Sequence, residues 1–154
     1  MGQHKGELLK LEHWLKDYFH QDSMNLRLLN IYPRDWHCKS RPLSFDFVAQ
    51  KTGKTIYIDI VGNDDWRQLI GKAVAYSFEL KSREVSDWEI WLLTDFSCWK
   101  EIKRLSDSER TIEVENWKKW YARLQYIIRE MLGPDFAQKV FLKYRTGDEI
   151  VDIV

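Results

Sequence analysis

The spacing of apolar residues in the first part of the chain changes between the period of a helix and the period of a strand. Residues 5–20 carry apolar side chains at helical intervals, which predicts an amphipathic helix. The stripe along this helix consists of Leu8, Leu11, Leu15, Tyr18 and Phe19. Residues 26–32, 44–50 and 54–61 are rich in aliphatic and aromatic residues and are bounded by turn residues, which predicts three strands.

The second part of the chain contains longer periodic segments. Residues 64–82 predict a helix with an apolar stripe that consists of Trp66, Leu69, Ile70, Ala73, Val74 and Ser77. The nearly continuous apolar run 88–96 is typical of a buried strand. Residues 113–131 predict a second long helix, and residues 134–144 predict a further helix. We expect the apolar tail, residues 149–154, to dock on the body of the protein or on a partner chain.

The order of these elements is helix, three strands, helix, strand and C-terminal helices. This order predicts an α/β fold with one mixed central sheet flanked by helices. The chain has 154 residues, of which 44% are hydrophobic and 31% charged, so it fits one domain with a sizeable core. Within this single domain, 1–154, we expect a core over residues 5–96 and a helical extension over residues 113–154.

Charge and cysteine content narrow the class of protein. The 24 basic and 24 acidic residues cancel, so the overall charge does not favour a strongly basic nucleic-acid binder, and only a local basic groove stays open. No run approaches about 18 consecutive apolar residues, so we expect no membrane span. Cys38 and Cys98 form no CxxC motif, which is typical of reduced thiols, and we expect an intracellular, cytoplasmic protein.

The two strands 44–50 and 54–61 form the most informative segment, because their side chains alternate between two faces. One face is apolar and must belong to the core; it consists of Phe45, Phe47, Ala49, Ile56, Ile58 and Ile60. Asp46 and Asp59 lie on the opposite face. A turn of two or four residues around Thr52-Gly53 pairs Lys51 with Lys54 and places Asp46 directly across from Asp59.

Two carboxylates in opposed positions repel each other, because their Cβ atoms are roughly 5 Å apart. A divalent cation would offset this repulsion, since Mg²⁺ and Mn²⁺ prefer carboxylate oxygens. A shared proton or nearby lysines would also offset it. The alternative is that both aspartates are solvated surface groups, but the neighbouring Val48 and Val61 favour a face that is partly covered.

This pattern resembles the PD-(D/E)xK nuclease superfamily, whose restriction-endonuclease-like core runs helix, three strands, helix, strand. Asp46 matches the acid on the second strand of that family, and Asp59 matches the acid on the third strand. An acid on the first helix often joins the metal site, and Glu7 or Glu12 occupies that place. Gly6-Glu7 before an amphipathic helix is similar to the start of archaeal Holliday-junction resolvases. The resemblance covers roughly residues 5–96.

The helix after the third strand extends the resemblance to RecB-type members, which carry polar residues there. Gln68, Lys72 and Tyr76 match these residues, on a polar stripe that consists of Gln68, Lys72, Ala75, Tyr76 and Glu79. The chain departs from the family at Val61, where a lysine normally follows the second acid, and at Pro42, which lies four residues before Asp46. Members of the superfamily are known to move this lysine onto the following helix. The alternative for Lys72 is an ordinary surface residue.

The resemblance implies a metal-dependent nuclease that hydrolyses phosphodiester bonds in DNA, or in RNA. It implies that Asp46, Asp59 and Glu7 hold Mg²⁺ or Mn²⁺, and that Asp46, Asp59, Lys72 and Gln68 form the catalytic group. The alternative is a catalytically inactive module of the same fold that binds nucleic acid or a protein partner; Val61 and the zero net charge favour it.

Basic and aromatic residues near the hairpin and the loop before it supply a candidate surface for the nucleic acid. Lys39, Arg41, Lys51 and Lys54 are candidates for contact with the phosphate backbone, and Trp36 is a candidate for stacking on an exposed base. The apolar tail and the tryptophan-rich helix 113–131 make a homodimer a further expectation.

Overall fold

The computed structural model describes residues 11, 13–19, 26–31, 45–51, 53–62 and 66–153. In this part of the chain, a six-stranded sheet has the strand order β1-β2-β3-β4-β5-β6. The strands are β1 (Leu26–Ile31), β2 (Phe47–Lys51), β3 (Lys54–Ile60), β4 (Trp88–Thr94), β5 (Val140–Thr146) and β6 (Glu149–Asp152). The helices are α2 (Trp66–Ser82), the 3-10 helix η3 (Phe96–Cys98), α3 (Lys100–Lys103) and α4 (Asp107–Leu132), and residues 13–19 are also helical.

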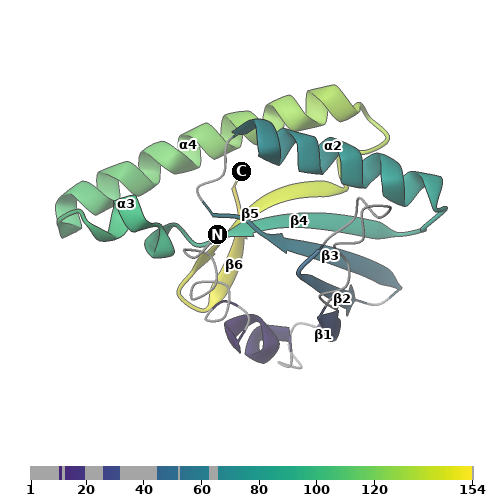
Figure 1. The fold of residues 1–154 in the computed structure, drawn as a ribbon, viewed down its shortest axis with the longest axis horizontal. Coiled ribbons are helices and arrows are strands. Elements are labelled where there is room, and N and C mark those ends of the chain that lie inside the picture. The colour runs from purple at the N-terminus through teal and green to yellow at the C-terminus, as the bar shows by residue number, and fades with distance from the viewer. Residues whose placement is uncertain are drawn as a thin grey trace.

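The sheet is mixed, which confirms the expected α/β architecture. The first three strands are antiparallel neighbours, whereas β3, β4 and β5 run parallel to one another, and β6 returns antiparallel to β5. Parallel neighbours need a crossover connection, and α2 and α4 supply the two crossovers. Both helices cover the same face of the sheet, and the helical residues 13–19 lie on the other side (Figure 1).

The two faces of the sheet build two apolar clusters. One cluster lies between the sheet and the helices α2 and α4, and its buried members include Leu69, Leu80, Leu92, Leu124 and Ile128. The other cluster joins the helical residues 13–19 to the opposite face and consists of Leu11, Leu15, Tyr18, Phe19, Phe47, Ala49, Ile56, Ile58, Trp91 and Leu93. The predicted stripe of the first helix is therefore confirmed at its four described positions, and Leu8 lies outside the described residues. Burial on both faces explains the continuous apolar run of β4.

The predicted helix over 134–144 and the expected helical extension over 113–154 are wrong at the C-terminal end. Residues 140–146 form β5, and the apolar tail forms β6, whose pairing with β5 includes Thr146 opposite Glu149. The turn between them is Gly147-Asp148, with a positive φ of 59° at Gly147, which is the backbone that a two-residue hairpin turn requires. The tail thus docks on the body of the protein, and Ile153 packs against the larger apolar cluster.

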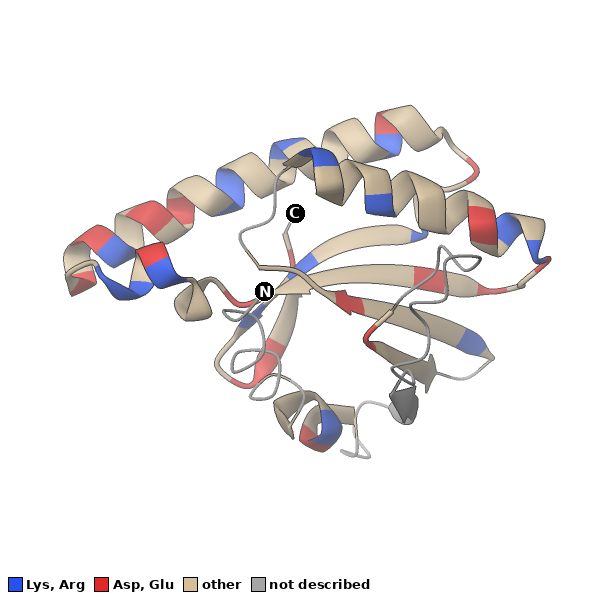
Figure 2. Cartoon of the chain, in the orientation of Figure 1, with Lys and Arg blue, Asp and Glu red and all other residues tan. Residues whose placement is uncertain are grey.

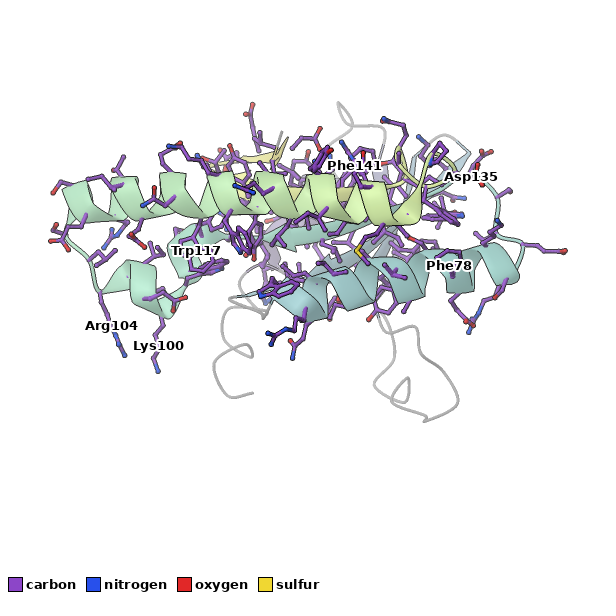
Figure 3. The ribbon with its side chains drawn as sticks, turned by 90° about the horizontal axis from the view of Figure 1, so that it is seen from above. Phe78, Lys100, Arg104, Trp117, Asp135 and Phe141 are labelled. Carbon is purple, nitrogen blue, oxygen red and sulfur yellow. The ribbon has the colours of Figure 1, made fainter. Side chains whose placement is uncertain are left out.

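The long helices α2 and α4 lie side by side, and both differ from their predicted bounds or faces (Figure 3). α4 begins at Asp107, before the predicted residue 113, because the Ser106 hydroxyl caps it by accepting a bond from the backbone N–H of Glu109. In α2, Trp66 of the predicted apolar stripe is 43% exposed, whereas Tyr76 of the predicted polar stripe is buried. α2 faces both the sheet and α4, so its buried arc is wider than one stripe. Among the described residues, no helix has the length and apolar content needed to cross a bilayer.

The central position of β4 leads to a stability prediction. The Leu92 side chain is 0% exposed, and Leu92→Ala is expected to lower the free energy of unfolding by about 2–5 kcal/mol, because it leaves a cavity between sheet and helices. Ile112→Ala is the matched control, since Ile112 on α4 is 62% exposed and its truncation should change this free energy by less than about 0.5 kcal/mol. Urea unfolding followed by circular dichroism measures both, and equal losses would contradict the buried position of β4.

Candidate functional site

The hairpin of β2 and β3 has the register that the sequence predicts. Lys51 pairs with Lys54, and the pairing continues without a break to Phe47 opposite Ile58. The regular pairing ends there, because the Asp46 N–H bonds to the carbonyl oxygen of Ile58, so the predicted pairing of Asp46 directly across from Asp59 is not formed. The side chains of the two aspartates nevertheless interact near the carboxyl end of β3, so their predicted proximity is confirmed.

Asp46 ends the pairing of β2 with β3 by using its own side chain. Its backbone N–H donates to the carbonyl oxygen of Ile58 at 3.0 Å, and its Oδ2 accepts a hydrogen bond from the backbone N–H of Ile60 at 2.8 Å. A carboxylate oxygen thus replaces a backbone carbonyl as the partner of Ile60. The ladder stops at this point, so β2 begins at Phe47 and not at residue 44 as predicted.

The aromatic residue before Asp46 lies on the side of the sheet that faces α2. The Phe45 ring centre is 5.0 Å from that of Tyr57 and 4.6 Å from that of Tyr76. The prediction that Phe45 shares a face with Phe47 is therefore wrong, because the two residues belong to different apolar clusters. The irregular backbone at Asp46 breaks the alternation of the strand, and Phe45 becomes part of the wall beside the aspartates.

Asp59 is a buried acid, and this excludes the reading of Asp59 as a solvated surface group. Its exposed fraction is 4%. Burial, followed by the negative charge of Asp46, raises the pKa of Asp59 from 3.8 to about 8. The hydrogen bond between the two carboxyl groups acts in the same direction, and Lys72 lowers the pKa in opposition.

Lys72 extends from α2 to the aspartates. Its Nζ atom lies 3.1 Å from Oδ2 of Asp59, and 31% of its side chain is exposed. Lys72 therefore lies at the buried acid and differs from an ordinary surface lysine. Two of the expected compensations for the opposed carboxylates are present together, namely a nearby lysine and a hydrogen bond between the acids.

Tyr76 lies at the site together with Lys72, as the shared stripe of α2 predicts, but it is buried, whereas the sequence assigned it to a polar face. It lies one turn after Lys72, is 8% exposed, and packs on the ring of Phe45. Burial, followed by the charge of Asp59, raises the pKa of Tyr76 to about 12, so the phenol stays protonated at neutral pH. The spacing of four residues from Lys72 is the signal in the sequence that brings both side chains to the same end of the sheet.

A second tyrosine, from α4, supports the backbone directly after β3. The Tyr121 hydroxyl donates to the carbonyl oxygen of Gly62 at 3.4 Å, and its ring packs on Phe96 at the end of β4. Only the fold shows that the Tyr121 side chain reaches Gly62. Tyr121 thereby links the ends of β3 and β4.

The remaining predicted residues are dispersed or lie outside the described part. Gln68 is exposed on α2, one turn before Lys72. Lys54 is the first residue of β3, so it lies about 16 Å from Asp59 along the strand, and its Nζ forms an ion pair with Glu89 at 2.6 Å. Lys51 pairs with Lys54 at that same distant end of the hairpin. The four residues Glu7, Trp36, Lys39 and Arg41 lie outside the described residues.

The two carboxyl groups of the site supply part of the ligands that a hard divalent cation needs. In the described ranges, no group of three or more His, Cys, Asp or Glu residues gathers as a cation site. Asp46 and Asp59 nevertheless bring two carboxyl groups together. Two carboxylates are a common protein contribution to a Mg²⁺ site, because this ion keeps several waters and takes further oxygens from a phosphate substrate.

The raised pKa of Asp59 predicts how stability changes with pH in protein treated with EDTA. For an acid whose pKa rises on folding, the stabilising contribution is complete below the unfolded pKa of 3.8 and is lost as the pH rises to about 8. Asp59→Asn removes this titration. From about pH 5 to pH 8, the free energy of unfolding of wild type should therefore fall by at least about 1 kcal/mol relative to that of Asp59→Asn.

The control for this experiment is Asp135→Asn, since Asp135 is exposed after α4. Its unfolding free energy should follow that of wild type over the whole pH range. Chemical denaturation at several pH values measures the three proteins. If the unfolding free energies of wild type and Asp59→Asn change in parallel with pH, the raised pKa of Asp59 is contradicted.

Comparison of the chain with protein-family models, with curated proteins and with solved structures finds no match in any of the three. The chemistry of Asp46, Asp59 and Lys72 is therefore the basis for assigning a function to this site.

Proposed function

We propose that this protein is a metal-dependent nuclease that hydrolyses phosphodiester bonds in DNA, or in RNA, at Asp46, Asp59 and Lys72. The observation that carries the proposal is the 3.1 Å contact between Lys72 Nζ and Asp59 Oδ2, beside Asp46. Buried, mutually interacting ionisable groups with strongly shifted pKa values are typical of functional sites. Two acids and a lysine at one point are also the residue types that phosphoryl-transfer chemistry needs.

The fold supports the restriction-endonuclease-like part of the proposal. The helical residues 13–19 are followed by β1, β2, β3, α2 and β4, in the order of the PD-(D/E)xK core that the sequence resembles. The first three strands are antiparallel, and β4 pairs parallel with β3. Val61, at the usual lysine position, is 2% exposed and belongs to the apolar cluster under α2. That environment suits valine and leaves Lys72 as the cation beside the acids.

Asp46 and Asp59 are the residues that would hold Mg²⁺ or Mn²⁺, and the resemblance adds Glu7. Such an ion, when bound, acidifies water and neutralises charge on the phosphate group. Two features of the site favour such a cation. The two carboxyl groups interact with each other, and Asp59 is buried away from bulk water. An isolated buried carboxylate is unfavourable, so a cation that pairs with it gains affinity.

Lys72 has the reach and the charge to act on the substrate. With a cation on the carboxylates, Asp59 no longer needs the ammonium group, and Lys72 becomes available to donate hydrogen bonds to a phosphate oxygen or to orient the attacking water. Its 31% exposure leaves the ammonium open to a substrate in solvent. Gln68, one turn earlier and exposed, would contact the phosphate backbone. Tyr76 is a positioning residue, since its ring holds Phe45 against the site.

The alternative function is a catalytically inactive module that binds nucleic acid or a protein partner. The observation that favours it is the pairing within the site, where Lys72 and the hydrogen bond with Asp46 already compensate Asp59. Figure 2 also shows acidic and basic residues interspersed along α2 and α4 and not separated into one basic face. Cation binding and cleavage therefore distinguish the two functions.

The cleavage prediction uses single-stranded, duplex and branched DNA and RNA, each with Mg²⁺, Mn²⁺ or EDTA. Wild type should cut at least one substrate with metal and none with EDTA. Asp59→Ala and Lys72→Met should each reduce the rate by at least about 100-fold, because they remove a cation ligand and a charged donor to the phosphate. Lys81→Met, at the other end of α2, should retain the rate. Absence of cleavage for every substrate would contradict the nuclease.

The cation prediction concerns the protons that binding releases. Because the pKa of Asp59 is about 8 without metal, Mn²⁺ has to displace a proton at pH 6–7, and its affinity should rise up to about tenfold per pH unit in this range. Calorimetry in two buffers of different ionisation enthalpy measures the released proton. Asp59→Asn should lose the proton release and weaken Mn²⁺ binding. Binding of Mn²⁺ that is unaffected by this substitution would contradict a site at Asp59.

A further inference from the structure

A pocket of about 300 Å³ lies at the carboxyl ends of β4 and β5, apart from the two aspartates. Its walls come from the segment after β4, from α4 and from the turn between β5 and β6. It is lined by Asp95, Phe96, Ser97, Cys98, Val114, Lys118, Tyr144, Arg145, Thr146 and Gly147. This volume is at the lower end of the range for small-ligand sites, so it fits one small group and not a large molecule.

The pocket shares an edge of the sheet with the proposed catalytic site. Asp59 is level with Leu92 of β4, and Leu92 is level with Leu142 of β5. The pocket begins two to three residues beyond that level, at Tyr144 and Asp95. Adjacent strands are about 4.8 Å apart, so β3 and β5 are separated by about 10 Å. Ligands of open α/β sheets bind off the carboxyl ends of the strands, which are the ends that meet here.

Aromatic side chains connect the two places. Tyr121 of α4 bonds to Gly62 after β3, and its ring centre is 5.4 Å from that of Phe96, which lines the pocket. The ring centre of Phe96 is in turn 5.9 Å from that of Tyr144. The floor of the pocket and the segment after Asp59 are therefore parts of one packed layer, and their spacing is fixed.

Two cations in the pocket are held in place by their neighbours. Arg145 Nη1 is 3.5 Å from Asp95 Oδ2, its Nε donates to the carbonyl oxygen of Gly147 at 3.1 Å, and its guanidinium lies 4.5 Å from the ring centre of Trp14. Lys118 Nζ lies 4.8 Å from the ring centre of Tyr144 and 3.1 Å from Glu115 Oε1. Both side chains keep 26–29% of their surface exposed, so an anion can reach them. Groups fixed in this way lose little freedom on binding.

The charge of the pocket indicates which anion fits. The charged lining residues are Lys118, Arg145 and Asp95, and Glu115 pairs with Lys118 beside the lining, so two basic and two acidic groups cancel. A phosphodiester carries one negative charge and therefore disturbs this balance less than a terminal phosphate, which carries nearly two. Phe96 and Val114 add apolar wall for a sugar or base beside the phosphate.

We propose that this pocket binds a phosphodiester group of the nucleic-acid strand, next to the one that is cleaved, through Lys118 and Arg145. The proposal rests on the proposed nuclease function and names how that site holds its substrate. If the pocket binds in this way, the protein prefers to cleave internal linkages, because the strand has to continue past the scissile phosphate to fill the pocket.

The test measures binding without cleavage. A fluorescent single-stranded DNA decamer is titrated into full-length wild type, Lys118→Gln, Arg145→Gln and the control Lys119→Gln, with Ca²⁺ in place of Mg²⁺. Lys118→Gln should weaken binding by about 5- to 20-fold and reduce the slope of log K against log salt by about 0.7, because one phosphate contact is lost. Lys119, an exposed neighbour on α4, should have an effect of less than twofold. Thermal unfolding checks that each variant is folded. If Arg145→Gln does not fold, the binding result of Lys118→Gln alone decides whether the pocket is correct.

Cys98 gives a second readout inside the pocket. Saturating decamer should slow alkylation of the Cys98 thiol at least threefold, measured by mass spectrometry of its peptide, and Lys118→Gln should remove this protection. Inorganic phosphate at the same concentration should not protect. Unchanged affinity in Lys118→Gln, no protection of Cys98, or no binding of the decamer to wild type would each overturn the pocket.

These outcomes separate the pocket from the nuclease. If wild type cuts DNA with Mg²⁺ while Lys118→Gln binds normally, the nuclease remains and the pocket is wrong. If the decamer binds, protects Cys98 and is never cut under any metal condition, the pocket remains and the nuclease is wrong.

Discussion

The contact between Lys72 and the buried carboxyl group of Asp59 determines much of the arrangement at this edge of the sheet. A carboxylate with 4% exposure is unfavourable unless a cation or a proton compensates it. Lys72 of α2 provides the cation, and the surroundings of Asp59, with Asp46 beside it, favour its protonated form. This requirement fixes the rotation of α2, because Lys72 has to point to the end of β3 while Leu69 and Ala73 stay in the core. Tyr76 then has to be buried on the same side, although its position in the helix suggests a polar face.

Stability alone does not explain why such a group is present. Replacing a buried ion pair by apolar residues is often neutral or stabilising, so an ion pair beside a second acid is weak evidence for a purely structural role. The surroundings are otherwise well suited to apolar packing, since Val61 and Phe45 are buried close by in the sequence. The presence of two acids and a lysine in this layer is the basis of the proposed chemistry on a charged substrate. The raised pKa of Asp59 is also the reason that the proposed cation binding would depend on pH.

The parallel arrangement of β3, β4 and β5 brings charged residues from distant segments to the same edge of the sheet, at the carboxyl ends of these strands. Because all three strands end on one side, Asp46, directly before β2, and Asp59 in β3 share that edge with Arg145 and Lys118. Both crossover helices lie over one face, so α2 supplies Lys72 and α4 supplies Lys118 to the same layer. A nucleic-acid strand along this edge would meet first the carboxylates and then the pocket, at a spacing set by the sheet.

The sequence by itself determined the local features of this protein. A turn of even length set the register from Lys51 opposite Lys54 to Phe47 opposite Ile58, which brings Asp46 and Asp59 to the same end of the hairpin. The interval from Gln68 to Tyr76 placed Lys72 on the helix behind them. The tertiary structure decided everything that depends on contacts between distant segments. Phe45 changes faces because Asp46 bonds to Ile60, Tyr76 is buried because α2 meets both sheet and α4, and residues 140–152 become a hairpin because β4 offers a free edge. The pocket joins residues 95–98, 114–118 and 144–147, which no periodicity relates, since only packing brings such separate segments together.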